Sequence, residues 1–132
     1  MEEVVDRLRE LNQPVPVPLD LPSFDDLVDA QEAMLIHIPD DFRDFLMQVS
    51  DVIYGSLEPA TIADPTSHTY LPELASRAWD FGVERHLIPI CESQGGYYVI
   101  DEQGEVTFWP GDKNDSWPSI WHWVRQVWLE EG

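Results

Sequence analysis

The chain has 132 residues, a length typical of one domain, and its apolar content of 43% is sufficient for a hydrophobic core. Twenty-six acidic residues against seven basic ones give a formal net charge of −19. This charge disfavours binding to nucleic acid or to anionic membranes and favours a basic partner, although it could also serve solubility alone.

The cysteine content and the N-terminus predict a cytoplasmic protein. Cys91 is solitary and lies in an apolar run, so we expect a reduced, buried thiol rather than a disulfide. The N-terminus is acidic where a secretory signal would be basic, and no apolar run has the length needed to span a bilayer.

The first third of the chain predicts two helices separated by an extended segment. Residues 2–11 place apolar side chains on one side of a short helix, and alternating prolines then force residues 14–18 into an extended conformation. Ser23, with an aspartate three residues later, predicts a capping box and a helix over residues 24–35. The expected apolar stripe of this helix comprises Phe24, Leu27, Val28, Met34 and Leu35. Gln31 interrupts the stripe, and we expect its side chain to bond to the backbone of a nearby loop.

The stretch from Ile38 to Leu46 carries the signals of another helix start. Pro39 suits a first helical turn because it has no N–H to pair, and Asp40 and Asp41 suit the positive end of the helix dipole. The apolar residues that recur at helical spacing, and that we assign to the core, are Phe42, Phe45, Leu46 and Val49. Asp44 is expected to remain exposed together with the two acids of the first turn.

The second half of the chain changes from helical to strand periodicity. A helix over residues 71–81 is expected to stop at Gly82, and a helix from about Pro118 closes the chain. Between them lie short β-prone runs separated by glycine-containing turns, at residues 87–91, 97–100 and 106–109. This order predicts a single α+β domain over residues 1–132, with an antiparallel-rich sheet, the C-terminal meander, packed with about four to five helices.

No residue pattern predicts catalysis, a cofactor or a metal site. Gly95-Gly96 and Gly104 lie at hairpin turns and lack the Lys-Ser/Thr sequence of a phosphate-binding loop. His86 and Cys91 do not have the spacing of paired zinc ligands. A catalytic alternative would have to bring Cys91 to His68 or His122 as nucleophile and base, and the core role for this cysteine is favoured. We therefore expect no enzyme, no cofactor and no bound metal.

Tryptophans are concentrated near the end of the chain, and this residue type serves both in cores and at binding hot spots. We expect Trp121 and Trp128 to pack the final helix on the sheet. Trp109 and Trp117 flank the turn at residues 111–116 and are expected to be partly exposed. The predicted partner-binding residues combine exposed acids with these two rings: Asp40, Asp41, Asp44, Trp109, Asp112, Asp115 and Trp117.

Taken in order, these features resemble the SUKH superfamily, in particular its Smi/Knr-type branch. The similarity covers residues 2–129. The matching stretches are the helix-start motif at residues 38–46, a loop with Gly55 and Leu57, the Leu87-Ile-Pro-Ile run, the Gly96-Tyr-Tyr run, the turn from Asp101 to Val106, and the aromatic-rich turn before the last helix. The chain departs from the family at Gln31, where members often carry Glu, and at Leu35, where they often carry Gly.

The resemblance implies protein binding rather than catalysis. Many bacterial SUKH proteins resemble immunity proteins, which bind and neutralise a cognate toxin domain, often a nuclease. A nuclease presents a basic face to its substrate, and a protein with a net charge of −19 could occupy that face. We therefore expect a basic toxin domain as partner, with no nucleic-acid or membrane partner. The alternative is a cellular regulatory or scaffold protein, since fungal relatives are associated with cell-wall synthesis and signalling.

Overall fold

Helices occupy the first part of the chain and strands follow them, which confirms the α+β prediction. The computed structural model describes residues 2–16, 18–93, 95–111 and 115–131. The first helices are α1 (Glu2–Leu11), α2 (Phe24–Met34), α3 (Asp40–Val49) and α4 (Leu71–Phe81). The strands are β1 (Ile88–Ser93), β2 (Gly96–Ile100), β3 (Val106–Trp109) and β4 (Ser116–Trp117). The chain closes with α5 (Ile120–Trp123), a π-helical turn η1 (Val124–Trp128) and α6 (Leu129–Glu131).

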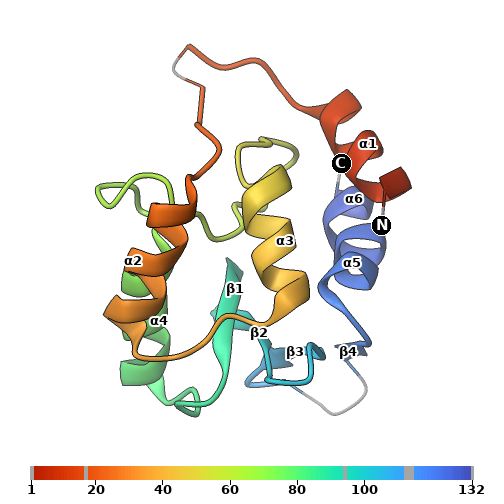
Figure 1. Ribbon diagram of the computed structural model, residues 1–132. Helices are drawn as coiled ribbons and strands as arrows, with labels where there is room; N and C mark the ends of the chain where they lie inside the picture. The colour runs from red at the N-terminus through yellow and green to blue at the C-terminus, as the bar shows by residue number, and fades with distance from the viewer. Residues whose placement is uncertain (1, 17, 94, 112–114, 132) are drawn as a thin grey trace.

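The arrangement of the helices around α3 is visible in Figure 1. Helices α2 and α4 lie together on one side of α3, whereas α1 and the closing segment α5–α6 lie on the other side. Arg9 ties α1 to the end of α3, because its guanidinium donates to the carboxylate of Asp51 at 2.8 Å and to the backbone oxygen of Gln48. None of the described helices is long and apolar enough to cross a bilayer.

The strands form one antiparallel sheet in the order β1-β2-β3-β4. The predicted three-stranded meander is confirmed, and the sheet gains β4, which the sequence analysis missed because two residues carry no recognisable alternation. The register shifts between Pro89 and Cys91, where the chain bulges. At this bulge the carbonyl of Ile90 accepts a hydrogen bond from Ala60 N at 2.8 Å, so the loop before α4 is attached to the edge of the sheet.

The α3 helix supplies the centre of the core, as its spacing predicts. Phe42, Phe45 and Leu46 have no exposed surface. Pro39, however, does not lie in the first helical turn. Its φ of −57° and ψ of 150° make it the extended residue before the helix, and its carbonyl accepts the first helical hydrogen bond, from Arg43 N at 2.9 Å.

The capping box of α2 is confirmed, but its apolar stripe is narrower than predicted. Asp26 N donates to Ser23 Oγ, and Ser23 N donates to the Asp26 carboxylate. The buried residues are Leu27, Ala30 and Met34. Phe24 and Leu35 are instead 69% and 85% exposed. Both lie at helix ends, and Leu35 has left the helix with φ of 56° and ψ of 37°.

Gln31 has the structural role predicted for it. Its Oε1 accepts a hydrogen bond from the backbone N–H of Ile38 at 2.9 Å, across the turn that joins α2 to α3. Ile38 has a buried side chain and immediately precedes Pro39, the residue before α3. The bond to Gln31 therefore connects α2 to the start of α3.

The ring contacts of the closing segment differ from the predicted ones. The ring centres of Trp121 and Trp128 each lie 6.0 Å from that of Phe45, so these two tryptophans pack on α3. Trp123 instead reaches the sheet, with its ring centre 5.3 Å from that of Tyr98. The indole N–H of Trp128 donates to Tyr54 O at 3.0 Å. This bond attaches the loop after α3 to the closing segment.

We expect Gln31→Met to destabilise the fold because it leaves the half-buried Ile38 N–H without its acceptor. The expected loss is about 1–2 kcal/mol in the free energy of unfolding. Gln31→Glu keeps an acceptor oxygen in place and is the matched control. Urea denaturation measures both, and equal midpoints for the two variants would contradict the proposed role of this bond.

Candidate functional site

Of the three acids of α3 that we expected to be exposed, Asp40 is largely exposed, whereas Asp41 and Asp44 are half-buried. The side chain of Asp40 is 79% exposed, that of Asp44 is 37% exposed, and Asp41 is half-buried. Arg43 lies between them, at 3.3 Å from the Asp40 carboxylate and 3.4 Å from that of Asp44. Exposed pairs of this kind contribute about 0–1 kcal/mol, so a partner's cation can compete for these oxygens at small cost.

A second group of predicted residues forms a hollow on the sheet. Asp115 and Trp117 line an open cavity of about 360 Å³ together with Ser93, Tyr98 and Phe108. The ring of Tyr98 contacts those of Phe108 and Trp117 edge-on, at 5.0 and 5.7 Å between ring centres. The hollow therefore has aromatic walls and an exposed carboxylate at its rim. This combination suits the head of a lysine or arginine side chain, which can contact ring faces and the carboxylate together.

Trp109 lies on the opposite face of the sheet from Trp117. Trp117 pairs with Val106 across β3 and β4, and side chains alternate along β3, so Trp109 points the other way. Its ring contacts Phe81, which is 63% exposed at the end of α4, at 5.8 Å. Phe81 also contacts Tyr97 at 6.3 Å. Trp109 is thus half-buried in a separate aromatic cluster.

The predicted binding residues therefore occupy three places rather than one surface. Asp40, Asp41 and Asp44 lie on α3, Asp115 and Trp117 line the hollow, and Trp109 lies behind it; Asp112 is outside the described residues. Sequence reasoning missed the remaining residues of the hollow: Ser93, Tyr98 and Phe108. The sequence shows that side chains in these β-prone runs alternate between the two faces of the sheet. It does not show which part of a face stays uncovered, because that depends on where α5 packs.

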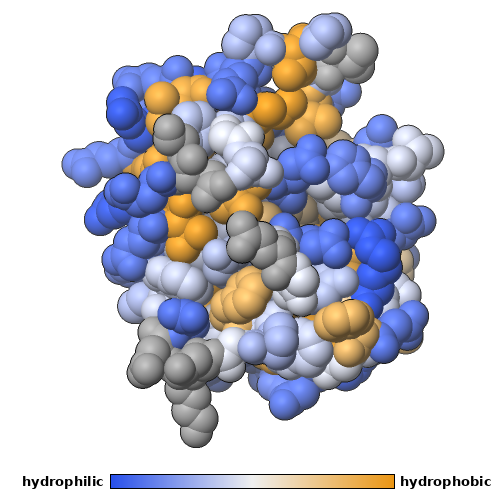
Figure 2. All heavy atoms as spheres, turned by 180° about the vertical axis from the view of Figure 1, so that it is seen from behind, coloured by the Kyte–Doolittle hydropathy of each residue, from blue (hydrophilic) through white to orange (hydrophobic). Residues whose placement is uncertain are grey.

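Hydrophobic side chains are spread over more than one place on the rear face of the molecule (Figure 2). Figure 2 shows, on the face opposite to that in Figure 1, several separate hydrophobic patches among hydrophilic side chains. Specific binding by such a surface would combine local apolar contacts with charge.

Another cavity, of about 210 Å³, lies beneath the loop that follows α3. Its walls are largely apolar and include Leu57, Pro59 and Trp128. At its mouth His68 Nε2 lies 2.8 Å from the Glu58 carboxylate. Part of the polar lining is a chain of hydroxyl groups 2.9 Å apart, those of Thr61, Thr69 and Ser67. These hydroxyls bond to one another, so they stabilise the loop rather than present open donors.

The residues considered for catalysis have other contacts. Cys91 is fully buried, and its Sγ lies 3.5 Å from Glu92 O. His68 pairs with Glu58, and His122 Nδ1 lies 2.7 Å from Ser119 Oγ. Within the described part of the chain, no group of three or more His, Cys, Asp and Glu side chains is placed to hold a metal ion.

The acids of α2 affect neighbouring residues. The pKa of Tyr70 is raised by its burial, and also by the negative charges of Asp29, Asp26 and Glu73. Two of these carboxylates belong to α2 and one to α4. The face formed by these helices therefore carries a negative potential, which favours cations and opposes anions.

Comparison with known proteins gives a family and a structural neighbour. The SUKH family model described as "SMI1-KNR4 cell-wall" matches residues 1–129. A crystal structure of a protein from Pseudomonas syringae pv. tomato superposes with a TM-score of 0.94 at 55% sequence identity, covering 98% of this chain and 99% of that one. None of the curated proteins matches the chain.

The buried phenol of Tyr97, in the Trp109 cluster, predicts a loss of stability at high pH. Burial raises the pKa of Tyr97 above its ordinary value of 10.0, and the nearby Glu92 carboxylate raises it further. The folded state therefore holds this proton more tightly than the unfolded state, so the contribution to stability is present below about pH 10 and is lost as the pH rises beyond it.

Tyr97→Phe is expected to reduce the fall in melting temperature between pH 9.5 and 11. Thermal unfolding monitored by circular dichroism measures this fall. Tyr54→Phe is the control, because the phenol of Tyr54 is half-buried near Leu129 on another part of the protein. An identical fall in the wild type and in Tyr97→Phe would contradict the assignment.

Proposed function

Because this chain belongs to the SUKH family, in the group described as SMI1-KNR4 cell-wall, we propose that it is a protein-binding module that binds and neutralises a toxin domain with a basic surface. The proposal is binding rather than catalysis. It rests on the shape and charge of the surface as well as on the family.

The observation that carries the proposal is the aromatic hollow with Asp115 at its rim. Tyr98, Phe108 and Trp117 supply rings that are already packed against one another, so little side-chain freedom is lost when a partner binds. A lysine or arginine seated there would exchange water for ring faces and a carboxylate. Hot spots of protein interfaces are enriched in tryptophan, tyrosine and arginine, and they tend to pair with hot spots on the partner.

The acids of α3 support the same proposal at longer range. Asp40 is largely exposed, and the chain as a whole carries a charge of −19. A nuclease or another toxin that acts on an anionic substrate must present a basic face. Complementary fields accelerate the encounter of two such proteins and select against acidic partners.

The direct test is co-expression with any toxin domain that a neighbouring gene encodes. We expect the chain to protect the producing cell and to form a complex with that domain. A gene with no toxin neighbour, together with recovery of the chain on housekeeping proteins only, would instead support the cellular regulatory alternative and contradict the proposal.

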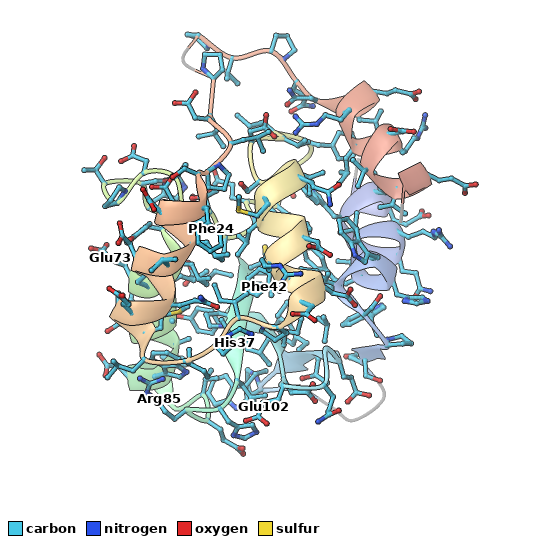
Figure 3. The ribbon with its side chains drawn as sticks, viewed as in Figure 1. Phe24, His37, Phe42, Glu73, Arg85 and Glu102 are labelled. Atoms are coloured by element: carbon cyan, nitrogen blue, oxygen red, sulfur yellow. The ribbon has the colours of Figure 1, made fainter. Side chains whose placement is uncertain are left out.

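Substitutions in the hollow are expected to weaken that complex. Asp115→Asn removes one exposed charge and should raise the Kd by about 5-fold, whereas Trp117→Ala should raise it by about 30-fold or more. Glu102→Gln is the matched control for Asp115→Asn, since Glu102 is an exposed acid in the turn at the other end of the β2–β3 hairpin (Figure 3). Calorimetric titration measures each Kd, and equal effects of Asp115→Asn and Glu102→Gln would contradict a specific role for the hollow.

The charge should act mainly on the rate of association. Raising the salt concentration from 50 to 500 mM shortens the range of electrostatic attraction, so the association rate constant should fall by about 10-fold or more while dissociation changes little. Stopped-flow fluorescence with the toxin domain measures both constants. An association rate that does not depend on salt would show that the acidity serves solubility alone.

A further inference from the structure

Leu35 combines three properties that rarely occur together. It is a large apolar residue, its side chain is 85% exposed, and its backbone has the left-handed φ of 56°. In this conformation the Cβ of an L-residue crowds the following carbonyl, which is why glycine or asparagine is common at this position after a helix. Leu35 therefore adds little to the core and sits in a conformation that is unfavourable for its side-chain type.

The turn that carries Leu35 is held in place by hydrogen bonds from both sides. The N–H of Leu35 donates to the carbonyls of Gln31 and Glu32, and the Gln31 side chain accepts from Ile38 N. Arg85, which lies near the end of α2 in Figure 3, donates to Met34 O at 2.6 Å. The guanidinium of this arginine also stacks 3.7 Å above the Trp79 ring, so the arginine itself is well fixed. Leu35 is thus displayed on a rigid turn.

The surface beside Leu35 is hollowed, and the stretch of sequence around Leu35 is acidic. Leu35 borders an open depression of about 310 Å³ with Val28, Ile36 and Glu32. Residues 20–44 contain one arginine, Arg43, which pairs with Asp40 and Asp44, and one histidine, His37, which also lines the depression. The acids of this stretch are Asp20, Asp25, Asp26, Asp29, Glu32, Asp40, Asp41 and Asp44. A large apolar side chain therefore projects from the end of α2 beside Glu32, in a stretch of sequence where acids far outnumber basic residues.

We propose that Leu35 is the anchor by which the α2–α3 face docks on the toxin domain, inserting into an apolar pocket that is ringed by lysine or arginine side chains. This inference rests on the proposed function and adds the point of contact. The occupant follows from charge complementarity: basic side chains of the partner meet Glu32 beside the anchor and the exposed Asp40 at the start of α3. Because the turn is already rigid, the anchor loses little conformational freedom on binding.

The test compares affinity and stability in variants of Leu35. Leu35→Gly and Leu35→Asn relieve the left-handed backbone but remove the apolar anchor. We expect each to raise the melting temperature, by about 3 °C for a chain of this size, and to raise the Kd for the toxin domain by about 10-fold or more. Leu35→Met retains an apolar side chain and should bind within about 3-fold of the wild type. Phe81→Ala, which truncates an exposed apolar residue at the end of α4, is the control and should leave the Kd unchanged.

Each combination of affinity and melting temperature in these variants either supports the anchor or contradicts it. Raised stability with lost affinity supports the anchor, because a purely structural residue would not move the two in opposite directions. Wild-type affinity in Leu35→Gly and Leu35→Asn overturns the anchor while the proposed function stands. A lowered melting temperature in both variants also overturns it, since Leu35 would then contribute to the fold. If the wild-type chain neither protects nor binds, the proposed function fails and the anchor fails with it.

Discussion

The packing of Trp123 between Tyr98 and Trp128 is the contact on which the rest of the structure depends. The ring of Trp123 is fully buried, 5.3 Å from Tyr98 on the sheet and 6.4 Å from Trp128 on the same closing segment. Trp128 in turn contacts Phe45, at the centre of α3. This chain of rings joins the sheet, the closing segment and the central helix into one core. It also orients Tyr98, whose other contacts are the walls of the aromatic hollow, so the packing that stabilises the fold shapes the candidate site as well.

The π-helical turn explains how the closing segment can bury so many tryptophans. In an α-helix, residues five apart differ by about 140° in direction, so Trp123 and Trp128 would not share a side. The wider turn over Val124–Trp128 brings them together. On a regular α-helix the apolar side chains from Ile120 to Trp128 would fall within an arc of about 160°, so the sequence pattern gives no signal of the irregular turn. The burial of Trp123 has a cost, because its indole N–H has no acceptor among the described residues.

Local signals predicted the helices and most of the sheet, because capping, helical spacing and glycine stops act within a few residues. The Ser23 capping box, the stripe of α3 and the stop at Gly82 are all confirmed. Features that depend on distant pairing were not predictable. The separation of Trp109 and Trp117 onto opposite faces requires the β3–β4 register, and the exposure of Leu35 requires knowledge of where α2 ends. For the same reason the candidate site was predicted as residue types rather than as a surface.

The distribution of charge bears on how an acidic protein could be selective. Acids occur along the whole chain, and attraction between exposed charges fades beyond about 8 Å at physiological salt, so charge alone would favour many basic proteins. Discrimination between such partners needs short-range contacts whose loss is costly for the wrong partner. The described surface offers two such contacts, each beside a carboxylate: the ring-walled hollow with Asp115 and the Leu35 side chain with Glu32. A partner that contacts both the hollow and Leu35 must match the distance between them as well as the charge beside each. A fixed distance between two contacts discriminates between partners more strongly than either contact alone.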